Sequence, residues 1–444
     1  MKIRIGRLCI FTLISLLSLF GLAAPASAQD SIPRQLIGSS KVPGKPAKTH
    51  KSKLAGAPSG YDYQVLYSFC SAPNCTDGEN PAGGLILDAA GNLYGTTSAG
   101  GTVIYGGTVF KLETSGHESL LYGFCPSGYP NCTDGYDPVA SLIQDAAGNL
   151  YGTTTSGGAS SDGFCATDGC GTVYKVDNAG HETVLYSFCS VAGCADGAGP
   201  IGGLIQDASG NLYGTTSSGG NEFGDGYTGG TAFKVDATGT ETVLYNFCSA
   251  ANCADGLFPL AGLIQDGASN LYGTTYGGGL GNCKTDYSNG CGTVFKVDGS
   301  GHETVLYSFN GGTDGANPES GLVRDASGNF YGTTYYGGAD NYGTVFKADT
   351  AGQETVLHTF GTVTNDGAYP EAGLFQDPAG DLYGTTAFGG ANGGGMVFEL
   401  NSAGQYTVLY SFGCSERRNC SRCRPDPRLG GQPVWHHSVR GREL

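Results

Sequence analysis

Tryptophan and basic side chains are scarce in this sequence of 444 residues. The only tryptophan is Trp435, and residues 61–412 contain seven Lys and Arg against 35 Asp and Glu, a formal charge of −28. A body this acidic repels nucleic acid and anionic membranes, so we expect neither as a partner. Several common catalytic motifs are also missing, since there is no G-x-S-x-G, no H-E-x-x-H and no phosphate-binding loop.

Long apolar runs are confined to the start of the chain. Residues 1–28 have the layout of a secretory signal, with basic residues, an apolar stretch over 8–22 and a small-residue cleavage site at 26–28. Residues 29–60 combine prolines with lysines and little apolar content, which predicts a flexible linker. No later segment is apolar enough to span a bilayer. We therefore predict a protein that is secreted or held at the cell surface.

One hexapeptide, N-L-Y-G-T-T, organises the rest of the chain. It recurs almost unchanged six times, at 92–97, 149–154, 211–216, 270–275, 329–334 and 381–386. A fixed period of this size is typical of repeat architectures. Every other feature must therefore be compared between equivalent positions of the repeats.

A single repeat reads as four short strands. In the third copy these are 204–206, 211–216, 231–235 and 242–247, with tight D-x-x-G turns after the first and third strands. Such β-branched and aromatic runs indicate an antiparallel meander. Six copies predict an all-β protein, a β-propeller of six complete four-stranded blades over residues 61–412. The alternative is a β-solenoid, whose coils are shorter and lack paired hairpin turns.

The meander also predicts two different rims. Strand direction alternates, so both tight turns of each blade lie on one rim and the longer loops lie on the other. The longer loops vary in length between repeats, which is typical of surfaces that carry function. The most irregular of them are 160–171, 221–230 and 280–292.

An Asp-Gly-x-x-Pro pattern precedes each first strand. Asp and Gly form turns and Pro opens an extended segment, so a structural role is one interpretation. A ring of carboxylates that binds Ca²⁺ is the alternative, although calcium takes six to eight oxygens and only one Asp recurs per loop. No other cofactor is indicated. The candidate metal ligands are Asp77, Asp134, Asp196, Asp255, Asp314 and Asp366.

Twelve cysteines occur in pairs that are present or absent together in a given repeat. In an exported chain this predicts local disulfides, and zinc fits poorly because no histidines lie near the pairs. Each bridge closes a small loop and should rigidify it. The predicted pairs are Cys70–Cys75, Cys125–Cys132, Cys165–Cys170, Cys189–Cys194, Cys248–Cys253 and Cys283–Cys291.

Near-identical blades favour a binding or structural module over an enzyme, because they present near-identical surfaces. The expected ligand is an extracellular polysaccharide or a surface protein, and we expect a monomer. The alternative function is a carbohydrate-active enzyme, a hydrolase or lyase that uses loop carboxylates. Tyrosines available in or near the loops for stacking on a ligand are Tyr63, Tyr105, Tyr136, Tyr227, Tyr276, Tyr287, Tyr336 and Tyr369.

Residues 413–444 depart from the repeat and become rich in arginine. Codons that encode residues 424–437 can also be read, one base later, as G-L-I-R-D-S-A-G-N-L-Y-G-T-T. We therefore predict a disordered, frameshifted remnant of a seventh repeat, and a parent protein with seven blades. Under this hypothesis Cys420-x-x-Cys423 and His436-His437 resemble a zinc site without having evolved as one.

The combined motifs resemble the Gloeo-Verruco (GloVer) tandem-repeat family. They are G-L-I-x-D, G-N-L-Y-G-T-T, the G-T-V-F-K of residues 292–296 and the E-T-V-L-Y-S-F of residues 303–309. The resemblance covers residues 61–412 and implies an exported bacterial protein at the surface or outside the cell. It implies no catalytic residues.

Overall fold

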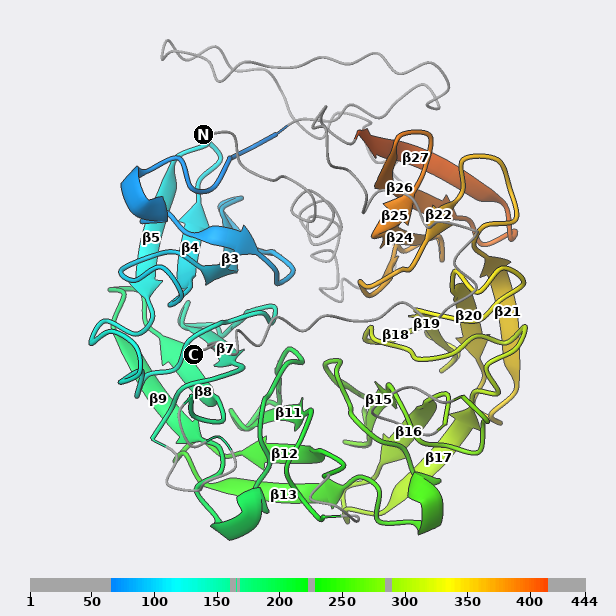
Figure 1. The fold of residues 1–444 in the computed structure, drawn as a ribbon, viewed down its shortest axis with the longest axis horizontal. Helices are drawn as coiled ribbons and strands as arrows, with labels where there is room; N and C mark the ends of the chain where they lie inside the picture. Colours follow the sequence, from blue (N-terminus) through cyan, green and yellow to red (C-terminus); the bar gives the residue numbers. More distant parts are fainter. Residues whose placement is uncertain (1–64, 160–164, 166–167, 223–227, 284–289, 414–444) are drawn as a thin grey trace, which may run out of the picture.

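Six β-sheets follow one another around a ring in the computed structural model, which describes residues 65–159, 165, 168–222, 228–283 and 290–413 (Figure 1). The first blade lies at the upper left of the view and the sixth at the upper right. This arrangement confirms the predicted all-β propeller with six four-stranded blades. The predicted signal, linker and frameshifted tail lie outside the described residues, apart from Gly413.

Each blade is an antiparallel meander in chain order. Its strands are β2 (Ile86–Leu87), β3 (Leu93–Ala99), β4 (Thr108–Leu112) and β5 (Glu118–Gly123) in blade 1; β6 (Ile143–Gln144), β7 (Leu150–Thr154), β8 (Thr172–Val176) and β9 (Glu182–Ser187) in blade 2; β10 (Ile205–Gln206), β11 (Leu212–Thr216), β12 (Thr231–Val235) and β13 (Glu241–Asn246) in blade 3; β14 (Ile264–Gln265), β15 (Leu271–Thr275), β16 (Thr293–Val297) and β17 (Glu303–Ser308) in blade 4; β18 (Val323–Arg324), β19 (Phe330–Thr334), β20 (Thr344–Ala348) and β21 (Glu354–Thr359) in blade 5; and β23 (Phe375–Gln376), β24 (Leu382–Thr386), β26 (Gly393–Leu400) and β27 (Tyr406–Gly413) in blade 6.

Short additional elements decorate the loops. Strand β1 (Glu79–Pro81) pairs with β3, and β22 (Gly367–Ala368) pairs with β25 (Phe388–Gly389). Single 3-10 turns lie at η2 (Pro73–Cys75), η4 (Ala192–Cys194) and η5 (Ala251–Cys253). In blade 3, the predicted strand ends agree with β10 to β13 to within one residue. Within the described ranges, no helix has the length and apolarity needed to cross a membrane.

The first half of N-L-Y-G-T-T, Asn-Leu-Tyr, stabilises the tight turn that precedes it. In blade 3, the side-chain amide of Asn211 and the hydroxyl of Tyr213 donate to Asp207 Oδ2, over 2.7 and 3.0 Å. Leu212, between them, points to the opposite face of the strand and is buried. The first half of the hexapeptide thus stabilises the turn and the core together.

The second half joins strands and blades. A Cβ on Gly214 would lie 2.7 Å from the ring of Phe233, so only glycine lets that ring pack against the strand. The Thr216 hydroxyl pairs with that of Thr231 at 2.9 Å inside the blade. The Thr215 hydroxyl donates to the carbonyl of Ala261, which belongs to the segment leading into the next blade. The repeat therefore encodes contacts between blades as well as within them.

Aromatic side chains fill the contacts between consecutive blades and the contact between residues 65–69 and blade 1, and we call these six contacts seams. A phenylalanine that follows the outermost strand of one blade, or Phe69 in the case of blade 1, meets an aromatic ring on the third strand of the next blade, with centroids 4.7 to 5.4 Å apart. These rings are fully buried in most seams, so the core of the molecule lies between blades. The pairs are Phe69–Phe110, Phe124–Tyr174, Phe188–Phe233, Phe247–Phe295, Phe309–Phe346 and Phe360–Phe398.

Candidate functional site

The two rims differ in their regularity. On the rim of tight turns, the first aspartate of the turn accepts the same side-chain hydrogen bonds from Asn and Tyr in blades 1 to 5. Burial alone would raise the pKa of these carboxyls, but the hydrogen bonds outweigh it and lower the pKa, to about 2 for Asp266. This rim is built for stability, and the candidate functional site lies on the other rim.

The six loop aspartates proposed as calcium ligands on that rim accept hydrogen bonds from the protein. In four of them one carboxylate oxygen accepts a hydrogen bond from the hydroxyl of a tyrosine on the preceding outermost strand, and Asp77 accepts one from Tyr67, over 2.7 to 2.9 Å. Asp366 instead contacts His358 Nε2 at 3.2 Å. Backbone N–H groups at the start of each loop donate to the same aspartates. These contacts suffice to explain the recurrence of Asp.

The calcium interpretation stays a prediction. In the described part of the chain, every close group of three potential metal-binding side chains consists of disulfide cysteines, in one case with Glu79. None of these groups contains one of the six loop aspartates.

The six predicted disulfides are all present in the structure. Four of them close the beginning of an Asp-Gly loop, and the other two bracket the variable loop inside blades 2 and 4. Blades 5 and 6 have none of these bridges. Their loops instead carry bulky aromatic side chains, which suggests a different function for that part of the rim.

Those side chains replace small residues at two repeated positions. Directly after N-L-Y-G-T-T, blades 1 to 3 carry Ser or Thr followed by Ala or Ser, whereas blade 4 has Tyr276, blade 5 has Tyr335 and Tyr336, and blade 6 has Phe388 at the second position. Directly after the loop proline, earlier repeats carry Ala, Val, Ile or Leu, whereas the last two carry Glu319 and Glu371. We call these six residues, with Tyr342 and Tyr369, the acidic–aromatic cluster.

Five of the cluster's six aromatic rings contact one another. Tyr369 is its centre: it stacks on Tyr335, with centroids 5.0 Å and planes 28° apart. It also makes edge contacts with Tyr336, Tyr342 and Phe388, at centroid distances of 5.8, 5.6 and 5.9 Å. Tyr335 is buried, while the other rings are partly exposed. The cluster therefore presents partly exposed aromatic rings that are packed around the buried ring of Tyr335.

The negative charges of two carboxylates act on tyrosines of this cluster. Burial, followed by the negative charges of Glu371 and Glu319, raises the pKa of Tyr335. Burial and the charge of Glu319 likewise raise the pKa of Tyr276. Each glutamate directly precedes a residue whose carbonyl accepts a threonine hydroxyl from the previous blade. The glutamates therefore lie where consecutive blades meet.

The backbone holds Tyr369 in place at some cost. The second residue after Asp-Gly has a positive φ in every repeat, and it is Asn, Asp or Gly in four of them. Tyr369 adopts φ 58°, a conformation that costs a residue with a side chain about 1–2 kcal/mol. Its N–H donates to the carbonyl of Tyr342 at 2.8 Å, and its own carbonyl accepts from Ala387 at 3.0 Å. Strain of this kind tends to persist where a side chain serves a function.

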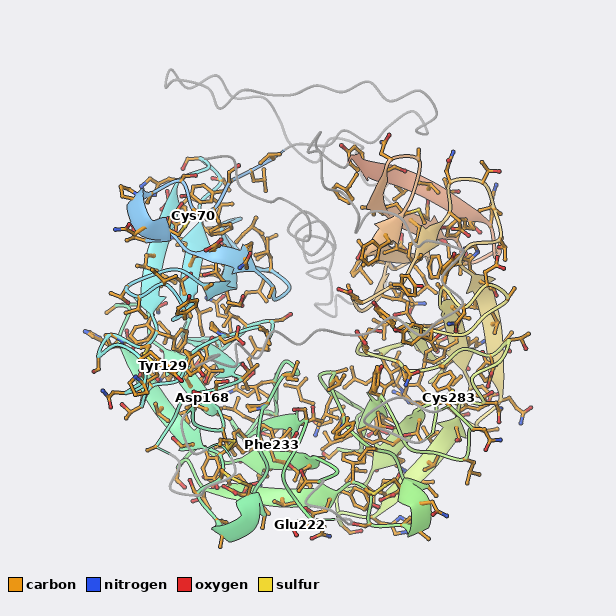
Figure 2. The ribbon with its side chains drawn as sticks, in the orientation of Figure 1. Cys70, Tyr129, Asp168, Glu222, Phe233 and Cys283 are labelled. Carbon is orange, nitrogen blue, oxygen red and sulfur yellow. A yellow bond between two sulfur atoms is a disulfide. The ribbon has the colours of Figure 1, made fainter. Side chains whose placement is uncertain are left out.

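A second aromatic–carboxylate contact lies in blade 2 (Figure 2). The Tyr129 hydroxyl donates to Asp168, and the Tyr129 ring meets that of Tyr136 edge-on at 6.3 Å. Tyr129 is 57% exposed. The bridges Cys125–Cys132 and Cys165–Cys170 close the two loops that carry Tyr129 and Asp168. This contact is smaller than the acidic–aromatic cluster but more accessible.

Sequence reasoning found part of this site. It singled out Tyr136, Tyr276, Tyr336 and Tyr369 as loop tyrosines, but not the glutamates or Tyr335. The glutamates could have been found from the sequence, because only in the last two repeats does an acidic residue replace an apolar one directly after the loop proline. Much of the three irregular loops lies outside the described residues (160–164, 166–167, 223–227 and 284–289), so their role stays a prediction.

Comparison with known proteins gives a family and weak structural likenesses. The Gloeobacter/Verrucomicrobia repeat profile matches residues 54–287 and 283–423. No curated protein matches the chain in sequence. Similar solved structures include a luciferin-regenerating enzyme (14% identity, 70% of this chain, 83% of that chain, TM-score 0.39). Another is the tricorn protease (12% identity, 76% of this chain, 26% of that chain, TM-score 0.39). A third is Porphyromonas gingivalis dipeptidyl peptidase 4 (10% identity, 80% of this chain, 49% of that chain, TM-score 0.38). Likenesses this weak carry no argument about activity.

Proposed function

Because the chain belongs to the Gloeobacter/Verrucomicrobia repeat family, we propose that it is an exported binding module that holds an extracellular polysaccharide on the acidic–aromatic cluster. The observation that carries the proposal is local: the cluster is where aromatic and acidic residues together replace small and apolar ones at repeated positions of the loop rim. The six local disulfides fit an oxidising location outside the cell.

The chemistry of the cluster suits sugars. Tyrosine rings offer flat apolar faces for the C–H faces of pyranose rings, and their hydroxyls exchange hydrogen bonds with sugar hydroxyls. Carboxylates accept two or more hydrogen bonds each, which orients a chain of hydroxyl groups. Tyr129 on blade 2 supplies a second contact of the same kind. Contacts at two places on one rim favour a long ligand over a small molecule.

A glycan-binding screen with the full exported chain tests the proposal. Tyr336→Ala removes a partly exposed ring of the cluster, and we expect it to weaken binding about tenfold. Tyr105→Ala is the matched control, since Tyr105 is an exposed loop tyrosine of blade 1 outside the cluster. Equal binding by both variants would place the glycan elsewhere on the molecule, and no binding by the unaltered chain would rule out a glycan.

One observation keeps an enzyme as the second candidate. Glu319 and Glu371 occupy equivalent positions in consecutive repeats, and both carboxylates act on Tyr335, which lies between them in the chain. Glycosidases commonly need two carboxylates on either side of the scissile bond. Release of reducing ends from a bound polysaccharide, abolished by Glu319→Gln or Glu371→Gln, would favour a hydrolase. Binding with no release of reducing ends would favour the module.

A further inference from the structure

We infer that Cys165 is a site of reversible modification by a small thiol, because two disulfides meet there. One is Cys165–Cys170 in the variable loop of blade 2, and the other is Cys189–Cys194 in the Asp-Gly loop that follows this blade. The sulfurs of Cys165, Cys170 and Cys189 all lie within 4.8 Å of one another. All four cysteines belong to or pack against the same hydrophobic cluster. This site is independent of the polysaccharide site proposed above.

The strand register explains why these sulfurs meet. The antiparallel pairing of β8 and β9 continues past the strand ends, where the N–H of Phe188 donates to the carbonyl of Gly171 at 3.0 Å. One residue further, the same register places Cys170 opposite Cys189. Residues opposite each other in an antiparallel pair have Cα atoms about 4.5–5.5 Å apart, a distance that a disulfide spans. A Cys170–Cys189 bridge therefore needs little movement of the backbone.

Within the described ranges, only blade 2 has cysteines at both of these opposed positions. Blades 1 and 3 have glycine opposite the first loop cysteine, and in blade 3 a Cβ on Gly229 would lie 3.0 Å from the Cβ of Cys248. This short distance shows how closely the two positions approach. Blade 4 has the reverse arrangement, since Cys291 stands opposite Asn310. Exchange between two bridges is therefore specific to blade 2.

Burial decides where an external thiol attacks. Cys165 is partly exposed, whereas Cys170, Cys189 and Cys194 are at most 1% exposed. Of these four sulfurs, a small thiolate such as that of glutathione therefore reaches only that of Cys165. The attack forms a mixed disulfide on Cys165, breaks the Cys165–Cys170 bond and releases Cys170 as a thiolate.

The released Cys170 thiolate has two targets. Return to Cys165 expels the small thiol and restores the first bridge. Attack on Cys189 forms the Cys170–Cys189 bridge and releases Cys194, which takes up the proton that the small thiol lost. Two disulfides are present before and after, so the exchange consumes no oxidant or reductant. Because this second route removes the thiol that would expel the modification, the mixed disulfide on Cys165 persists.

Reduced glutathione is the probe that tests the inference. The full chain, with its six bridges formed, is incubated with glutathione at about pH 8, acidified, treated with a maleimide and digested in acid without reduction. We expect mass spectrometry to find glutathione on Cys165, a peptide pair linked through Cys170–Cys189, and maleimide on Cys194. Glutathione on Cys165 beside an intact Cys189–Cys194 bridge, no adduct at all, or new bridges to other blades would each overturn the inference.

Blade 4 supplies a matched control in the same sample (Figure 2). Cys283 is partly exposed and bridged to the buried Cys291, as Cys165 is to Cys170, but Asn310 replaces the neighbouring cysteine. We expect about tenfold less glutathione on Cys283 than on Cys165, because the Cys291 thiolate has only Cys283 to return to. Equal modification of the two would mean that exposure alone decides, and would overturn the inference.

Two variants test the exchange step itself. Replacing both Cys189 and Cys194 by Ser removes the receiving bridge, so glutathione on Cys165 should fall to the level found on Cys283. Cys165→Ser leaves Cys170 as a thiol from the start, and we expect the free thiol to appear on Cys194 without any glutathione. A free thiol that stays on Cys170, in a variant with the circular dichroism of the unaltered chain, would overturn the inference. If a variant fails to fold, the glutathione experiment on the unaltered chain decides.

Discussion

His358 and Tyr406 stack face to face across the seam between blades 5 and 6, with ring centroids 3.7 Å apart and planes 8° apart. Both contact Asp366: His358 Nε2 lies 3.2 Å from Oδ2, and the Tyr406 hydroxyl donates to Oδ1 over 2.7 Å. In the other five seams the equivalent positions hold Tyr and Glu, as Tyr67/Glu118, Tyr122/Glu182, Tyr186/Glu241, Tyr245/Glu303 and Tyr307/Glu354. Two residues have therefore changed together at one seam.

The hydrogen bond that Tyr406 makes at this seam indicates what the glutamates do at the other five seams. The Tyr406 hydroxyl donates a hydrogen bond to the loop aspartate from the position that Glu occupies in the other seams. In the five regular seams the glutamate Oε1 is buried and, within the described residues, has no hydrogen-bond partner. Burial, followed by the charge of the neighbouring loop aspartate, raises the pKa of each glutamate to about 7. A protonated glutamate would donate as Tyr406 does.

The first prediction is a fall in stability as pH rises from about 5 to 8. Each seam glutamate has a pKa of about 7 in the folded protein against an ordinary value of 4.5, so the folded state binds more protons in this range. The stabilisation is complete below pH 4.5 and is lost through pH 7. The tight-turn aspartates act in the opposite sense, because their pKa values are lowered and their stabilisation is lost below about pH 4. Thermal denaturation between pH 3 and 9 should show a maximum near pH 5, and a Tm that rises steadily to pH 8 would contradict this account.

The second prediction concerns a single seam. Glu303→Gln replaces a titrating group by an amide that donates a hydrogen bond at every pH. The charge of Asp255 acts on Glu303, and the buried Oδ1 of Asp255 has no hydrogen-bond partner within the described residues. We expect the free energy of unfolding at pH 8 to rise by about 1 kcal/mol, after discounting for solvent screening, which raises Tm by a few degrees. At pH 5 we expect Tm to stay unchanged. Glu303→Ala, which cannot donate, should lower Tm at both values. Identical behaviour of the two variants would show that the proton is irrelevant.

The third prediction tests the glycine of the repeated hexapeptide. Gly273→Ala places a Cβ 2.7 Å from the ring of Phe295, so it should destabilise the protein by about 1–3 kcal/mol through overpacking. Gly267→Ala in the same blade is the matched control, because its Cβ would have no neighbour within 4 Å. Chemical denaturation should separate the two variants clearly. A neutral Gly273→Ala would mean that the blade can widen to admit the methyl group.

How much of this could be predicted from the sequence depended on repetition. The strands, the tight turns and the six disulfides recur with fixed spacing, and each was predictable from local turn and strand chemistry. The seam glutamates also recur, but a glutamate at the start of an amphipathic strand looks like any exposed residue. Its burial depends on the neighbouring blade. The acidic–aromatic cluster required the opposite approach, because it consists of departures from the repeat at positions far apart in sequence.

The fourth prediction is that all six cysteine pairs are oxidised in the exported protein. Mass spectrometry without reduction should find no free thiol among the twelve cysteines between Cys70 and Cys291. Replacing both Cys248 and Cys253 by Ser should lower Tm only slightly, because the bridge closes a loop with a sequence separation of 5. A metal that co-purifies and is released by thiol alkylation would contradict the disulfide assignment.

The last prediction is that the gene carries a frameshift after the sixth blade, and residues 65–69 give it a structural basis. The Tyr67 hydroxyl donates to Asp77 over 2.9 Å, and the Phe69 ring lies 4.7 Å from that of Phe110. These are the contacts that the outermost strand of each blade makes with the next blade, yet no described blade precedes blade 1 in the chain. A seventh blade that takes its first three strands from the restored frame would use this segment as its fourth.

Restoring the frame by one base should therefore close the ring. Val65 and Leu66 are now 49% and 37% exposed, and we expect them to become buried, with slower amide exchange and a higher Tm. An exposed strand edge also invites aggregation, so the restored protein should remain monomeric at higher concentration. Resequencing the codons for residues 413–424 decides the matter. A confirmed sequence that encodes no G-N-L-Y-G-T-T in the shifted frame would refute the seventh blade, and residues 65–69 would then be a clasp that belongs to a six-bladed protein.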